Sequence, residues 1–120
     1  MNIVIEPLIL RNASLPDTTA LEFRAVVDPA CTHLCIPEAV RVQLGLAIIE
    51  LKPAFFADET RALIPYVGPI ELRFKDRIGF CGALVMGDEV LLGALPMEDM
   101  NLIINRRTLT LEFSPTGARL

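Results

Sequence analysis

The chain has 120 residues, of which 52% are hydrophobic and 22% charged, and its formal net charge at pH 7 is −4. This length fits one domain, and this composition is too apolar for a disordered chain. Acidic and basic residues are interleaved, there is no Trp, and no basic patch alternates with aromatic residues, so we expect no binding to nucleic acid. The longest uncharged run covers ten residues, 78–87, which is too short to span a membrane.

Asn2–Leu10 is rich in Ile and Leu and predicts a first strand, followed by a turn at 12–17. Leu21–Val27 alternates apolar and charged residues, which predicts a strand that runs into Asp28. Pro37–Gly45 is the one clear helix, because proline suits a first helical position and glycine suits the cap after the last turn.

The remainder of the chain predicts short strands separated by polar turns. The expected strands are 48–56, 62–67, 70–74, 78–86, 90–92, 102–104 and 109–113. A polar turn at 57–60 joins the first two as a hairpin, and Pro96–Met100 resembles a short helical turn. Many short strands with one or two short helices predict a mainly β, closed, barrel-like fold in a single domain, residues 1–120.

The first ten residues, MNIVIEPLIL, carry Glu6 inside an apolar run and no basic region before it. We therefore expect no secretory signal and a cytoplasmic location. The cysteine count of three is odd, which disfavours a secreted disulfide framework and favours reduced thiols. The mean hydropathy of +0.49 indicates that some apolar surface is buried against another chain.

The stretch VVDPACTHLC, residues 26–35, invites comparison with a metal site. Cys31, His33 and Cys35 would be three ligands within five residues, but zinc takes about four, and Cys81 is alone. A thiol nucleophile would need a base, and His33 beside Cys31 is the only local pair. We expect neither a metal nor a cofactor, with the two cysteines as small apolar fillers.

The aspartate in this stretch suggests different chemistry. The segment AVVDPACT, residues 25–32, resembles the catalytic loop of retropepsin-like aspartic peptidases, which reads hydrophobic-hydrophobic-Asp-Thr-Gly-Ala. Leu91, Leu92 and Gly93 resemble the second signature of that family, two apolar residues and a glycine. The segment 34–38 resembles the helix entry that follows the loop in the bacterial, single-lobe members. The likeness covers roughly residues 21–113, in the order of the family.

The resemblance implies a closed acid-protease fold whose active site is shared by two copies of the chain. Peptide hydrolysis by this route uses two carboxylates that share a proton around one water, because like charges so close cannot both ionise. A twofold axis would bring Asp28 of each chain together in a homodimer. The resemblance makes one turn the tip of a flap over a peptide or protein substrate held as an extended strand. Its residues are Ala57, Asp58, Glu59 and Thr60.

The motif loop departs from the family at three positions. Pro29, Ala30 and Cys31 stand where the family has Thr, Gly and Ala. Pro29 lacks the hydroxyl that braces the two loops across the dimer, and Ala30 restricts φ where glycine would not. Thr32 has a hydroxyl, but we expect it to point away from the position of this brace, because it lies two residues after Ala30.

Three hypotheses remain. The first is a homodimeric aspartic endopeptidase, and the second is a catalytically inactive peptide-binding or dimerisation module on the same fold. The third is an unrelated small β-barrel within a larger assembly, in which Asp28 is an ordinary loop residue.

Overall fold

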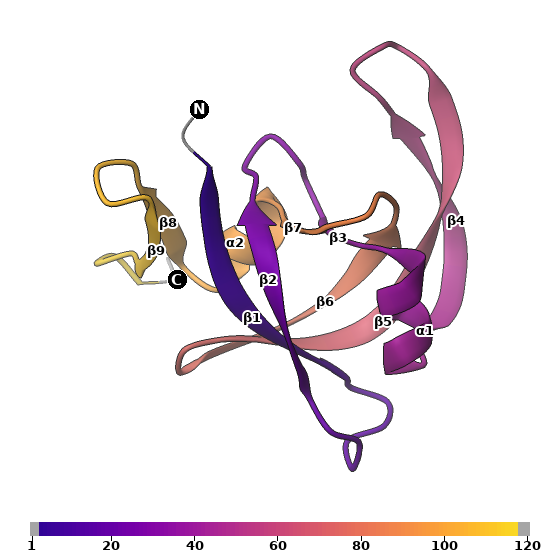
Figure 1. Ribbon diagram of the computed structural model, residues 1–120, viewed down its shortest axis with the longest axis horizontal. Helices are drawn as coiled ribbons and strands as arrows, with labels where there is room; N and C mark the ends of the chain where they lie inside the picture. Colours follow the sequence, from indigo (N-terminus) through magenta and orange to yellow (C-terminus); the bar gives the residue numbers. More distant parts are fainter. Residues whose placement is uncertain (1–2, 118–120) are drawn as a thin grey trace.

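The computed structural model describes residues 3–117, most of which lie in strands (Figure 1). The strands are β1 Val4–Asn12, β2 Leu21–Val27, β3 Leu34–Ile36, β4 Ala47–Phe55, β5 Arg61–Phe74, β6 Arg77–Val85, β7 Val90–Leu92, β8 Leu102–Asn105 and β9 Thr110–Phe113. The helices are α1 Glu38–Leu44 and α2 Ala94–Asp99. The prediction of a mainly β chain with one or two short helices is confirmed.

Six strands close into a barrel in the order β1-β2-β7-β3-β6-β5, and β5 pairs back with β1. β4 extends the sheet beyond the barrel by pairing with β5 alone. Two of the pairings are parallel, β2 with β7 and β3 with β6. Each strand of the ring therefore has a partner on both sides along part of its length, and barrel closure is one way in which small β proteins avoid unwanted strand pairing.

Apolar side chains from all six barrel strands fill the interior. The largest fully buried side chains are Phe74, Leu8, Leu10, Leu34, Ile36, Ile70, Leu72, Leu92 and Val67 from the barrel strands, with Leu46 before β4 and Leu111 of β9. Each such side chain stabilises the fold by about 1.5–3 kcal/mol relative to its exposed state. This core holds the ends of β2 and β7 in place, and the candidate site follows directly from those two ends.

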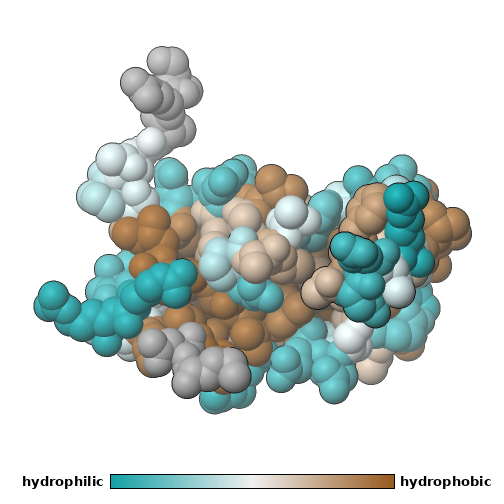
Figure 2. Space-filling view, turned by 90° about the horizontal axis from the view of Figure 1, so that it is seen from above, coloured by the Kyte–Doolittle hydropathy of each residue, from teal (hydrophilic) through white to brown (hydrophobic). Residues whose placement is uncertain are grey.

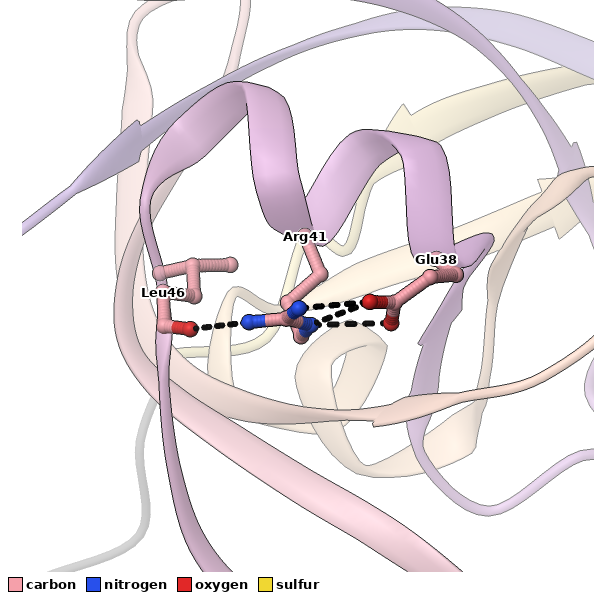
Figure 3. Close-up of polar contacts among 3 residues, drawn as sticks. All are labelled: Glu38, Arg41 and Leu46. Atoms are coloured by element: carbon pink, nitrogen blue, oxygen red, sulfur yellow. Dashed lines mark hydrogen bonds and ion pairs between the residues drawn. The ribbon is translucent and has the colours of Figure 1, made fainter.

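Helix α1 is fixed at both of its ends. Gly45 closes the helix in the left-handed conformation, with φ 65°, as the sequence predicted. Arg41 donates hydrogen bonds to the carboxylate of Glu38, and it also donates to the carbonyl oxygen of Leu46 at 3.1 Å (Figure 3). The side chain of Asn12, which is buried, donates to the carbonyl oxygens of Leu44 and Gly45. Helix α1 is thereby joined both to β1 and to the start of β4.

Two elements differ from the sequence-based expectation. The resemblance predicts a helix entry at 34–38, but Leu34–Ile36 form the strand β3. All three of its residues are buried, so the alternation that marks a half-exposed strand is absent. The strands expected at 62–67 and 70–74 are one strand, β5, because its pairing with β6 shifts register between Val67 and Ile70 and continues.

β8 and β9 form a separate two-stranded sheet beside the barrel (Figure 1). The backbone N–H of Leu111 in β9 donates to the carboxylate of Glu6 in β1 at 2.8 Å, which attaches this sheet to the barrel. Within residues 3–117, no helix is long and apolar enough to cross a membrane.

Candidate functional site

Asp28 stands at the point where β2 leaves the barrel. Its backbone N–H donates to the carbonyl oxygen of Leu92 at 2.9 Å, and its own carbonyl oxygen accepts from the N–H of Cys31 at 3.1 Å. Its carboxylate accepts the N–H of Ala30 at 3.0 Å. The side chain is half-buried, so the carboxylate is held in a defined position and still reaches the surface.

The second signature packs directly against this loop. β7 pairs in parallel with β2, with Leu91 opposite Val26. Beyond β7, the N–H of Ala94 donates to the carbonyl oxygen of Cys31 at 2.8 Å. A Cβ atom on Gly93 would lie 2.3 Å from the carbonyl oxygen of His33. The structure thus brings together the two segments that the sequence singled out, and their contact requires glycine at position 93.

Two of the three substituted residues of the motif loop lie at its surface, whereas Cys31 is half-buried. Pro29, Ala30 and Thr32 are exposed. Ala30 is not among the residues with positive φ, so the restriction that we expected from its Cβ causes no strain in this conformation. The hydroxyl of Thr32 is 2.7 Å from Nδ1 of His33, in its own loop. An alanine in place of glycine is therefore compatible with the carboxylate position, whereas the hydroxyl expected at position 29 is missing.

The side chains of the two cysteines and of the histidine have different neighbours. Cys31 Sγ lies 3.3 Å from Cys35 Sγ, whereas the ring of His33 packs edge-on against Tyr66, with centroids 6.1 Å apart. The ammonium of Lys52 lies 4.4 Å from the centre of the other ring of this pair, that of Tyr66. Burial and, to a smaller extent, the charge of Lys52 lower the pKa of His33. In the described part of the chain, no three His, Cys, Asp or Glu side chains are grouped closely enough to hold a metal ion.

A pocket of about 360 Å³ lies beside the loop. Residues from β4, β5, β6 and α2 line it together with His33, among them Lys52, Tyr66, Phe80, Leu95 and Asp99. The sequence-based reasoning missed this pocket because its walls come from segments far apart along the chain. Its size falls within the range of small-ligand sites.

The hairpin of β4 and β5 extends beyond the barrel, at the same end of the molecule as the loop that follows β2 (Figure 1). At its tip, the carboxylate of Asp58 accepts hydrogen bonds from the hydroxyl and the N–H of Thr60, which lower the pKa of Asp58. Glu59 adopts a left-handed conformation, with φ 68°, and Ala57 is exposed. The expected turn at 57–60 is therefore present.

This hairpin carries many exposed apolar side chains. They are Ile48, Ile49, Leu51, Phe55 and Leu63, each at least half exposed. Apolar surface is visible at this end of the molecule, at the right of Figure 2. The guanidinium of Arg61 lies 5.0 Å from the ring centre of Phe55 near the tip. An apolar, projecting hairpin is suited to cover a bound chain.

Comparison with known proteins identifies the fold of this chain. No protein-family model matches the chain, and no curated protein matches it. The retroviral protease-like domain of Ddi1 from Leishmania major is 9% identical, with 97% of this chain and 91% of that domain covered and a TM-score of 0.64. A retropepsin-like aspartic protease from Rickettsia conorii is 14% identical, with 88% and 91% covered and a TM-score of 0.55. The chain has the retropepsin-like fold.

Proposed function

We propose that the protein is an aspartic endopeptidase that acts as a homodimer, with Asp28 of each chain in the water-activating pair. The observation that carries the proposal is the position of Asp28. It follows β2 directly, its carboxylate accepts the N–H of Ala30, and its backbone is bonded to Leu92 beside the second signature. The retropepsin-like fold supports the same assignment by analogy.

The homodimer is required by the chemistry. Each chain supplies one carboxylate in this loop. Hydrolysis by a water molecule held between two carboxyl groups needs one of them as a base and the other as an acid. The ionised carboxylate takes a proton from the water, which attacks the peptide carbonyl carbon. The protonated carboxyl group donates its proton to the carbonyl oxygen, which gives a gem-diol. The proton taken from the water then passes to the nitrogen as the C–N bond breaks, and the other carboxylate takes a proton back from the gem-diol.

The sheet of β8 and β9 supports a dimer surface. A two-stranded sheet is marginally stable by itself and leaves strand edges without partners. One N–H of β9 is used by Glu6, and Ile103 of β8 is 44% exposed. A second copy of the chain would bury this apolar residue and pair with the strand edge.

The substrate class proposed is an extended peptide or an unfolded segment of a protein. The apolar hairpin of β4 and β5 covers the peptide and excludes water from the reacting bond. Backbone hydrogen bonds between the peptide and strand edges would hold it in register. The free thiols of Cys31, Cys35 and Cys81 support a reducing compartment, and we place the activity in the cytoplasm.

Asp28→Asn tests the proposal. It removes the ionisable group and retains its size, so we expect cleavage of a peptide library between pH 3 and pH 8 to fall by about 100-fold or more. The matched control is Asp88→Asn, an exposed turn residue, whose cleavage rate should equal that of the parent chain. A parent chain that sediments as a dimer, cleaves nothing in the library and does not bind a statine-type transition-state mimic would contradict the proposal.

A second candidate is a catalytically inactive peptide-binding or dimerisation module. Pro29 favours it, because this residue has neither a hydroxyl nor an N–H with which to brace the partner loop. The double variant Pro29→Thr with Ala30→Gly separates the two candidates. If cleavage appears only in this variant and is lost again on adding Asp28→Asn, the parent chain has the peptidase fold but no catalytic activity. Cleavage by the parent chain that depends on Asp28 excludes the inactive module.

A further inference from the structure

We propose that Cys31 and Cys35 form a redox-responsive dithiol, which reacts with a low-molecular-weight disulfide and closes to an intramolecular disulfide that staples the Asp28 loop to β3. The two sulfur atoms are 3.3 Å apart, and both face the carbonyl oxygen of His33, at 3.4 Å and 3.9 Å. No use of these thiols follows from the peptidase proposal, so the inference stands apart from it.

The backbone on either side is already fixed. The carbonyl oxygen of Cys31 accepts the N–H of Ala94 at 2.8 Å. Cys35 lies in β3, between β6 and β7, opposite Leu84 and Leu91. A disulfide needs an S–S distance of about 2.05 Å, so the sulfur atoms must approach by about 1.2 Å. Side-chain rotation can supply a movement of this size while the backbone bonds persist.

Exposure determines the order of reaction. Cys31 is half-buried and reachable from solvent, whereas Cys35 is fully buried. Burial, and then the hydrogen bond with Cys31, raises the pKa of Cys35 to about 12, which keeps it as a thiol. Because the thiolate is the attacking form, the first attack falls to Cys31.

One molecule of a small disulfide such as oxidised glutathione is sufficient to oxidise the pair. The Cys31 thiolate attacks one sulfur of that disulfide, a mixed disulfide forms, and one small thiolate departs. The Cys35 sulfur then attacks Cys31 Sγ, its proton passes to the second departing thiolate, and the Cys31–Cys35 bond forms. In total the two protein thiols lose two protons and two electrons, and the small disulfide takes them up to become two thiols.

Closure affects the loop that carries Asp28. Cys31 donates its N–H to the Asp28 carbonyl oxygen, and Cys35 belongs to a strand in the centre of the sheet. A bond between the two cysteines therefore connects the loop covalently to the barrel wall. We expect the loop to open less often once the bond has formed, since a short covalent ring restricts its conformations.

Peptide mapping tests the inference directly on the full chain. Trypsin cleavage after Arg24 and Arg41 leaves one peptide with both cysteines, and Cys81 falls in a different peptide. The folded chain is treated briefly with oxidised glutathione, then denatured and alkylated with iodoacetamide. The peptide 25–41 should then be about 2 Da lighter than the same peptide with two free thiols and should carry no alkyl group. Cys81 should remain alkylated, and the oxidised fraction of Cys81 should be at least about tenfold smaller than that of the Cys31–Cys35 pair. Reduction with dithiothreitol should restore two alkylation sites in the peptide 25–41.

Two variants and one further measurement complete the test. Cys35→Ala should retain a stable glutathione adduct on Cys31, and the matched control Cys81→Ala should close as the parent chain does. Hydrogen exchange at 28–33 should slow on oxidation of the parent chain. The inference is overturned if folded parent protein keeps two alkylatable thiols in the peptide 25–41, if glutathione remains on Cys31 without closure, or if closure leaves that exchange unchanged.

Discussion

At the scale of single residues, His33 is the group whose surroundings differ most from what its neighbours in sequence suggest. In the sequence it stands between two cysteines and resembles a ligand. In the structure its ring packs on Tyr66, and the ammonium of Lys52 lies on that same tyrosine. A neutral ring suits this place, because burial and a nearby positive charge both disfavour the imidazolium.

A pH titration tests this view. The pKa of His33 is lowered from 6.5, so the unfolded chain takes up a proton first as the pH falls. The stability contributed by the neutral ring is therefore complete above pH 6.5 and is lost as the pH falls from there towards the lowered pKa. NMR of this single histidine should give a pKa below 6.5, and His33→Gln should abolish that part of the pH dependence of unfolding.

Two lysine variants supply the control for this titration. Lys52→Gln removes the positive charge near the ring and should move the pKa of His33 back towards 6.5. Lys75→Gln, whose ammonium instead lies against Phe74, should leave it unchanged. A pKa at or above 6.5 in the parent chain would contradict the described surroundings of His33.

At the scale of elements, the site depends on how closely β7 and the loop after β2 approach each other. Gly93 follows β7, and its backbone lies against the carbonyl groups of Cys31 and His33. A sequence pattern can mark this glycine, but it cannot say what the glycine touches. The contact is between backbones, so neither side can move aside at small cost.

Gly93→Ala should therefore destabilise the fold. The added Cβ would meet two backbone oxygen atoms at 2.3 Å and 2.6 Å, and we expect the free energy of unfolding to fall by about 1–3 kcal/mol. Urea denaturation measures the change. Gly117→Ala is the matched control, because nothing lies within 4 Å of the position of its Cβ. Equal stability of the two variants would show that the loop is not packed against Gly93.

At the scale of the whole molecule, the proposed function depends on a second copy of the chain. Within residues 3–117, the strands that pair with only one other strand are β8, β9 and β4 of the projecting hairpin. Ile103 of β8 is exposed on the first of these. A polar group there would be buried without a partner if the edge lies in a dimer interface.

Ile103→Asp should weaken the dimer by at least about tenfold in dissociation constant, because it places a charge in an apolar contact. Sedimentation equilibrium over a range of concentrations gives this constant. Leu15→Asp is the matched control, since Leu15 is 46% exposed against 44% for Ile103 and lies in the turn after β1. Dimerisation weakened equally by both variants, or by neither, would exclude β8 from the interface.

Much of the fold follows from local pattern. Alternation along 21–27, the capping of α1 by Gly45 and the polar turn at 57–60 each depend on a few neighbouring residues, and the structure agrees with all three. β3 could not be predicted in this way, since a buried strand of three residues has no alternation. The continuity of β5 depends on its partner β6, which accommodates the shift in register.

The sequence by itself determined the chain's mainly β class and singled out the loop that begins at Asp28 and the second signature, 91–93, as segments of interest. Only the tertiary structure decided that these segments touch, that Cys31 and Cys35 meet and that His33 turns to Tyr66. The physical reason is the range of the interactions. Strand alternation and helix caps depend on neighbours within a few residues, whereas the site depends on pairings between strands distant in the chain, which form only when the barrel closes.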